Sequence, residues 1–102
     1  MNKQIHVYII GDVIGVGFRA WTFVKAKELN LTGWVRNNHQ RHDVFGRGGG
    51  VEALFQGPED KLLDILHFLR IGPSISRVDD IETYWKDLKE IEQLYMSFEV
   101  RK

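Results

Sequence analysis

Residues 11–19 combine Gly11, Gly15 and Gly17 with Arg19, between a segment that alternates like a strand and one with helical spacing. At such a turn the first N–H groups of the helix have no backbone partner, and the helix dipole places partial positive charge there. Glycine permits positive φ angles and close approach of the backbone to a ligand, and arginine adds a planar cation with five donors. This segment therefore predicts an anion site, with phosphate as the natural ligand.

Two common phosphate-binding motifs do not match this segment. A nucleotide-binding P-loop ends in Gly-Lys-Ser or Gly-Lys-Thr, which residues 11–19 lack, and their glycine spacing does not complete the dinucleotide fingerprint. Glycines after a strand are by themselves more often a structural turn than a ligand site. The anion-site hypothesis thus needs support from elsewhere in the chain.

Composition limits the class of protein. A chain of 102 residues that is 43% hydrophobic can bury a core as one domain over residues 1–102, without metals or disulfides. Fourteen basic and fourteen acidic residues cancel, so no net charge attracts nucleic acid or an anionic membrane. The absence of cysteine excludes thiol catalysis and thiolate metal sites. The apolar N-terminal run is too short and too alternating for a signal peptide or membrane span, so we expect a cytoplasmic protein.

Hydrophobic periodicity predicts the elements that position residues 11–19. The expected elements are strands at residues 5–10, 33–38, 51–56, 78–85 and 94–100, and helices at 20–29 and 58–71. The second helix would bury an apolar stripe of Leu62, Ile65, Leu66 and Leu69. Residues 38–50 would form a long, mobile connection, and 86–93 a loop with room for a helical turn. This β-α-β-β-α-β order, with an extra C-terminal strand or tail, predicts a ferredoxin-like α+β sandwich, in which two helices cover one face of an antiparallel sheet.

The strand at residues 33–38 carries a second polar group of interest. Alternation places Trp34 and Arg36 on one face and Val35 and Asn37 on the other. Asn37 therefore ends, with a polar amide, a row that otherwise points inward. An asparagine at the end of a strand is by itself more often a turn residue.

Three segments in order resemble the successive signatures of the acylphosphatases: GDVIGVGFR at residues 11–19, GWVRN at 33–37 and VEALFQGP at 51–58. Later segments at 72–73, 77–79 and 98–101 are also similar to that family, so the resemblance covers nearly the whole chain. It implies an enzyme that hydrolyses a small-molecule acyl phosphate to a carboxylate and inorganic phosphate, with no metal or other cofactor. We expect the protein to be a monomer.

The resemblance also implies roles for particular residues. It assigns phosphate binding to Arg19 and the orientation of the attacking water to Asn37. The phosphate would also lie against the loop amides of Gly15, Val16, Gly17 and Phe18. The chain departs from the family in having Ile14 where glutamine is usual, and in a longer segment after Asn37.

Other readings of the sequence are less favoured. His39, His42 and Asp43 lie in a glycine-rich loop without a third fixed ligand, so we expect a polar loop there and no metal site. The same fold carries RNA-recognition domains, but no basic aromatic consensus is present, and we expect no nucleic-acid binding. The main alternative is a non-catalytic module that binds phosphate or carbamoyl phosphate for a partner. A single domain of 102 residues favours the free-standing enzyme instead.

Overall fold

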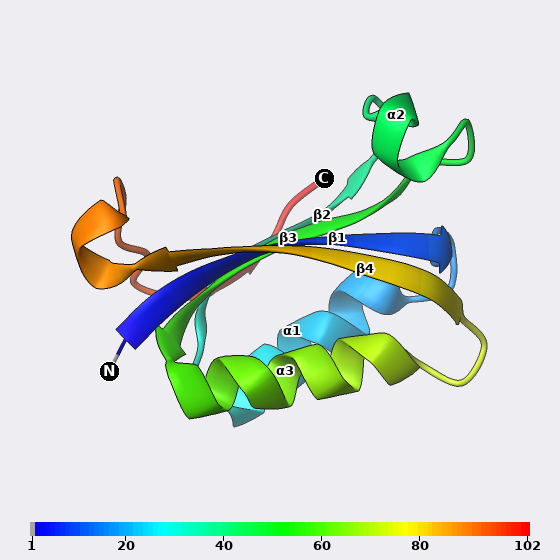
Figure 1. Cartoon of the computed structure of the whole chain (residues 1–102). Coiled ribbons are helices and arrows are strands. Elements are labelled where there is room, and N and C mark those ends of the chain that lie inside the picture. Colours follow the sequence, from blue (N-terminus) through cyan, green and yellow to red (C-terminus); the bar gives the residue numbers. More distant parts are fainter. Residues whose placement is uncertain (1) are drawn as a thin grey trace.

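The computed structural model describes residues 2–102, which form a five-stranded sheet with its two longer helices on one face (Figure 1). The first residue of the expected 1–102 domain lies outside the described residues. The elements in chain order are β1 (Asn2–Asp12), α1 (Phe18–Glu28), β2 (Thr32–Asn38), α2 (His42–Phe45), β3 (Gly50–Pro58), α3 (Glu59–Ile71), β4 (Arg77–Asp87), a 3-10 turn (Leu88–Glu90) and β5 (Phe98–Val100). This order confirms the predicted ferredoxin-like arrangement with an extra C-terminal strand.

The strands lie in the order β4-β1-β3-β2-β5. The neighbouring pairs β4-β1, β1-β3 and β3-β2 are antiparallel, whereas β5 pairs with β2 in parallel. The sheet is therefore mixed, because the extra strand alone runs parallel to its neighbour. This parallel pairing brings residues near position 100 beside β2 and next to the N-terminus of α1.

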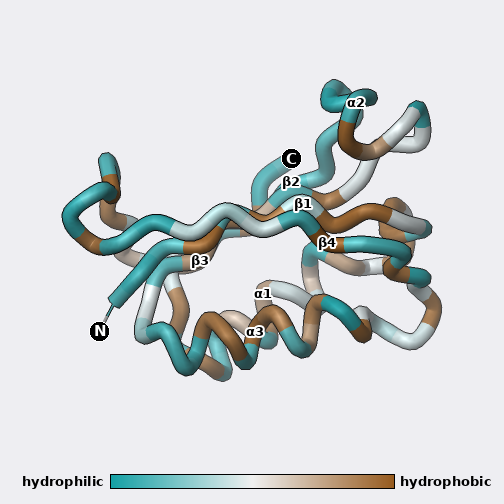
Figure 2. Tube along the Cα trace, in the orientation of Figure 1, coloured by the Kyte–Doolittle hydropathy of each residue, from teal (hydrophilic) through white to brown (hydrophobic). Residues whose placement is uncertain are grey.

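The core lies between the sheet and the helices α1 and α3. One side chain in two along β1, beginning with Ile5, faces the helices and is fully buried. The apolar stripe predicted for the second helix is buried on α3, which ends at Gly72 with a positive φ of 69°. Figure 2 shows hydrophobic and hydrophilic stretches alternating along α3, as expected for a helix with one face on the sheet. No helix in residues 2–102 is both long and apolar enough to cross a membrane.

The last strand is shorter than the predicted residues 94–100. Leu94 and Met96 alternate in sequence like strand residues, but they are 66% and 94% exposed. Residues 91–97 are instead held beside β3 by polar contacts, because the Tyr95 amide donates to the Gln56 side chain, which in turn donates to the Gln93 carbonyl. The alternation there does not reflect a buried face.

The predicted loop at residues 38–50 contains the helical turn α2, which lies on the sheet face opposite α1 and α3 (Figure 1). Phe45 is 9% exposed and its ring meets that of Tyr8 on β1 edge to face, at 5.6 Å between centroids. The Arg41 guanidinium lies over the same tyrosine ring at 5.4 Å. The expected long connection therefore contains a helical turn that packs on the sheet.

Candidate active site

The loop that joins β1 to α1 has a backbone shape that only glycine adopts easily. Gly15 and Gly17 both have φ of 77°, and a Cβ added at either position would meet nothing within 4 Å. Glycine is therefore needed for the dihedral angle and not for lack of space. Val13, which is 1% exposed, anchors the start of the loop in the core.

The N-terminus of α1 is free to receive an anion. Gly17 is its N-cap and offers no side chain to the first N–H groups, and the first turn contains no acidic residue. Backbone hydrogen bonding within the helix begins at Trp21, whose amide donates to the Gly17 carbonyl at 3.0 Å. The preceding amides, with the positive end of the helix dipole, form the kind of site that binds phosphate.

The pairing register of β2 fixes the direction of Asn37. Val35 pairs with Ala53 and Asn37 with Val51, so all four side chains lie on the face covered by the helices. Val35 is fully buried, and Asn37 is half-buried where the strand reaches the edge of α1. The sequence prediction that this amide ends an inward-facing row is confirmed.

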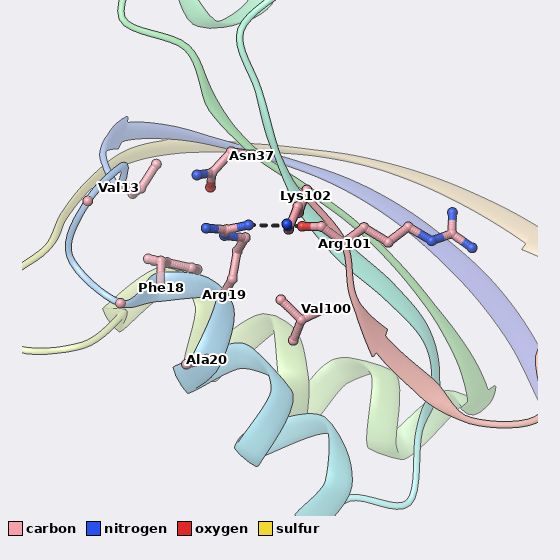
Figure 3. Close-up of a pocket in the computed structure, with 10 residues that line it drawn as sticks. Val13, Phe18, Arg19, Ala20, Asn37, Val100, Arg101 and Lys102 are labelled. Carbon is pink, nitrogen blue, oxygen red and sulfur yellow. Dashed lines mark hydrogen bonds between the residues drawn. The ribbon is translucent and has the colours of Figure 1, made fainter.

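Arg19 and Asn37 meet in a cavity of about 370 Å³ at the N-terminus of α1. Figure 3 shows the Asn37 amide directed toward the Arg19 guanidinium across this cavity. Arg19 Nη1 donates to the Arg101 carbonyl at 3.0 Å, which orients the guanidinium. The lining residues are Val13, Gly15, Gly17, Phe18, Arg19, Ala20, Asn37, Val100, Arg101 and Lys102.

The cavity lining favours anions. Within residues 2–102 it includes three cationic residues and no aspartate, glutamate or histidine. The Arg101 side chain points away from the cavity in Figure 3, because its guanidinium lies over Trp34 on the other face of the sheet, at 5.1 Å from the ring centroid. Arg19 is therefore the guanidinium that faces the cavity.

Two residues of the predicted loop are placed differently from the rest. Val16 packs against the core, and neither Val16 nor Ile14 is among the described residues that line the cavity. A main-chain amide of Val16 remains part of the proposed phosphate loop, but its side chain contributes to packing. Ile14 is a half-buried residue of the loop itself.

The sequence did not reveal the contribution of residues 100–102. The Arg101 amide donates to the Val35 carbonyl at 2.8 Å, and its carbonyl accepts from Arg19, so this residue, which follows β5, connects the strand of Asn37 with Arg19. The signal was the family-like segment at 98–101, but periodicity cannot say which strand a short C-terminal strand joins. In the loop that contains His39 and His42, the Asp43 carboxylate accepts two hydrogen bonds from Arg41.

Comparison with known proteins agrees with this geometry. The family model described as acylphosphatase matches residues 5–100. The acylphosphatase of Nitrobacter hamburgensis is 46% identical over 76 residues, which cover 74% of this chain and 69% of that protein. The structure of an acylphosphatase from Coxiella burnetii aligns with a TM-score of 0.80 at 33% identity, over 98% of this chain and 93% of that one.

A larger protein shares the fold as one part of its length. Full-length HypF, solved in a phosphate- and nucleotide-bound form, aligns with a TM-score of 0.79 at 28% identity, over 100% of this chain and 12% of that chain. The family match extends across the three segments that contain the glycine loop, Asn37 and β3. The chain therefore belongs to the acylphosphatase family.

Proposed function

We propose that this chain hydrolyses acyl phosphates at the cavity between α1 and β2, with Arg19 and Asn37 as its catalytic residues. The observation that carries the proposal is that these two side chains, from different elements, face one cavity at an uncapped helix N-terminus. A monomeric state and a cytoplasmic location remain predictions from the sequence.

Phosphate binding would use the loop and the helix together. The amides of residues 15–18 and the positive end of α1 would surround the phosphoryl oxygens, and Arg19 would bind two of them at once. These fixed donors stabilise the charge on the phosphoryl oxygens in the transition state without reorganisation. Because the described lining holds no carboxylate or imidazole ligands for a cation, we expect no need for a divalent metal.

Asn37 would hold the attacking water in line with the bond that breaks. Its carboxamide has both an acceptor and donors, so it can orient a water molecule without acting as a strong base. The water oxygen bonds to phosphorus, the bond from phosphorus to the acyl oxygen breaks, and the carboxylate leaves with the electron pair. A phosphoryl oxygen accepts the proton that the water loses, which completes inorganic phosphate.

This mechanism asks little of the protein beyond positioning. Acyl phosphates have a good leaving group, so orientation and electrostatic stabilisation supply most of the rate enhancement. No side chain with a pKa near neutrality takes part in the step. We therefore expect a broad pH profile and no loss of activity with a chelator.

The alternative, a phosphate or carbamoyl-phosphate binding module that acts with a partner, is less well supported. It is motivated by the similarity to a short part of HypF. The relatives whose length this chain mostly spans are acylphosphatases. Asn37 also lines the cavity, and the proposed hydrolysis gives this amide a task that a pure phosphate site would not require.

The direct test is hydrolysis of benzoyl phosphate in the presence of EDTA. We expect the wild-type rate to exceed the buffer rate by several orders of magnitude, as is typical of enzymes. Arg19→Ala should lose activity with weaker binding of inorganic phosphate, whereas Asn37→Ala should lose kcat and keep phosphate binding.

Matched controls are the exposed residues Arg70 and Asn2, whose alanine variants should retain wild-type rates. A wild-type rate equal to that of buffer would refute the enzyme and favour the binding module. An Asn37→Ala variant as fast as wild type would remove the water-orienting role while leaving the activity intact.

A further inference from the structure

Glu52 of β3 lies on the sheet face opposite the cavity. Its buried carboxylate accepts hydrogen bonds from several side chains. The residue is 4% exposed. Its Oε1 accepts from Arg36 Nε and from Asn38 Nδ2, both at 2.9 Å, and lies 2.7 Å from Arg36 Nη2. Its Oε2 lies 2.6 Å from His6 Nε2 on the neighbouring strand β1. The carboxylate therefore joins three adjacent strands at one point.

The donors from β2 are the two residues on either side of Asn37. Because strand side chains alternate, Arg36 and Asn38 point to one face while Asn37 points to the other, into the cavity. A single carboxylate oxygen thus holds the strand immediately before and immediately after Asn37. The backbone at Asn37 is therefore held by contacts on the sheet face opposite the cavity.

This anchor lies where β2 would otherwise be free to fray. Asn38 is the last residue of β2, and its Oδ1 accepts from the amides of Gln40 and Arg41, at 2.9 and 3.3 Å. The same side chain therefore ties Glu52 to the first turn of the following segment. Strand ends are the parts of a sheet that open at the lowest free-energy cost, so such an anchor narrows the motion of Asn37.

The network is complete, which favours a fixed geometry. Among residues 2–102, no buried side-chain polar atom lacks a hydrogen-bond partner. Glu52 and Asn38 are the buried members of this network, so removal of the carboxylate would leave the Asn38 amide group buried without this acceptor. Glu52 is its centre, because it accepts from all three of the other side chains.

We infer that Glu52 is a positioning residue for hydrolysis, which sets the direction of the Asn37 amide through Arg36 and Asn38. The inference rests on the proposed role of Asn37. Glu52 does not touch the cavity, so it acts only through the strand. The phosphate loop lies on a separate connection, between β1 and α1, and is not held by this network.

The expected kinetic signature separates positioning from binding. In Glu52→Gln the carboxylate becomes a neutral amide whose NH₂ group faces other donors. The hydrogen bonds that hold Arg36 and Asn38, on either side of Asn37, are then weakened. We expect kcat to fall by roughly ten- to a hundredfold, the loss typical of a displaced catalytic group. KM for benzoyl phosphate and the inhibition constant of inorganic phosphate should stay within about twofold, because neither depends on water orientation.

A double-mutant cycle with Asn37→Ala distinguishes this from general damage to the fold. If Glu52 acts through Asn37, Glu52→Gln should change kcat by less than about twofold once Asn37 is alanine. Equal fold-losses of kcat in the two backgrounds would overturn the inference, as would a wild-type kcat for Glu52→Gln alone. A wild type without activity would instead refute the proposed function, and a fast Asn37→Ala would refute the role on which the inference rests.

A second variant and a control guard against loss of folding. Arg36→Gln leaves the carboxylate with its other donors, so we expect a smaller loss of kcat that is also absent in the Asn37→Ala background. If Glu52→Gln does not fold, Arg36→Gln decides the matter by the same cycle. Glu92→Gln, at an exposed glutamate, should leave every kinetic constant unchanged.

Discussion

Gly17, before α1, and Gly48, before β3, differ in whether their backbone conformation requires glycine. Gly17 and Gly48 both have open space where a Cβ would lie, but only Gly17 has a positive φ. The positive φ at Gly17 also places the amides at the start of α1, since this residue is the N-cap. The two positions therefore form a matched pair for a test of backbone conformation.

We expect Gly17→Ala to lower the free energy of unfolding by about 1–2 kcal/mol, the usual cost of an L-residue in the left-handed region. The same variant should bind inorganic phosphate more weakly, because relief of the strain moves the amides. Gly48→Ala should stay within about 0.5 kcal/mol of wild type. Urea unfolding with and without phosphate measures both quantities, and equal effects of the two variants would contradict the assignment.

Glu52 also links stability to pH. Burial by itself would raise its pKa, but hydrogen bonds from His6, Asn38 and Arg36, with the Arg36 charge, outweigh burial and lower the pKa from 4.5 to about 2. A carboxyl group with a lowered pKa in the folded state contributes stability above its unfolded pKa and loses that contribution as pH falls through the folded value.

We therefore expect Glu52→Gln to be less stable than wild type by about 1–2 kcal/mol at pH 7, because the Arg36 side chain is 44% exposed and solvent screens its charge. The difference in free energy of unfolding should be complete above pH 4.5 and should shrink as the pH falls to about 2. Urea unfolding at pH 7, 4 and 2.5 gives this curve. A difference that did not change between pH 7 and pH 2.5 would show that the carboxylate charge is not the source of the stability.

The sequence predicted Arg19 and Asn37 but not Glu52, for a physical reason. The motif segments point to the first two, and strand alternation gave the direction of Asn37. On β3, however, residues 50–56 are all buried, so alternation no longer separates a core face from a solvent face. A buried acid on such a strand is visible only once its partners on β1 and β2 are placed.

At the level of elements, sequence periodicity was reliable where one face is buried and weaker where polar contacts hold the chain. The stripe on α3 and the order of the first four strands were predicted correctly. Residues 94–97 were expected in a strand, but β5 begins only at Phe98. The segment before it is held by a hydrogen bond from the Tyr95 amide to the Gln56 side chain. The turn α2 was not expected because its single buried anchor, Phe45, leaves no periodic pattern.

The docking of α2 can be tested through that anchor. Phe45→Ala should release residues 39–49 from Tyr8, with a loss below the roughly 3–5 kcal/mol typical of a core phenylalanine, because the segment lies at the edge of the fold. Hydrogen exchange should then rise in residues 39–49 while β1 and β3 stay protected. Arg47→Ala, an exposed change in the same segment, is the control. Unchanged exchange in Phe45→Ala would mean that the ring does not hold the segment.

For the whole molecule, the site predicts a ligand-dependent stability. Inorganic phosphate that binds only the folded state should stabilise it by about 1.4 kcal/mol at ten times its dissociation constant. For a chain of 102 residues this corresponds to a rise in Tm of roughly 6–11 °C. Arg19→Ala should lose most of the rise, whereas Arg70→Ala should keep it. An equal rise in Tm with phosphate for both variants would show that phosphate binds at a site other than the one containing Arg19.

The contact between Arg19 and the Arg101 carbonyl joins residues 82 positions apart in the chain. Closing so long a loop costs more entropy than local pairing, so contacts of this range form after the helices and hairpins. The pairing of β1 with β4 spans a similar range, so both the cavity and the complete sheet require the two ends of the chain to meet. During refolding, the burial of tryptophan should precede the return of activity, and activity reports the completed chain topology and not its collapse.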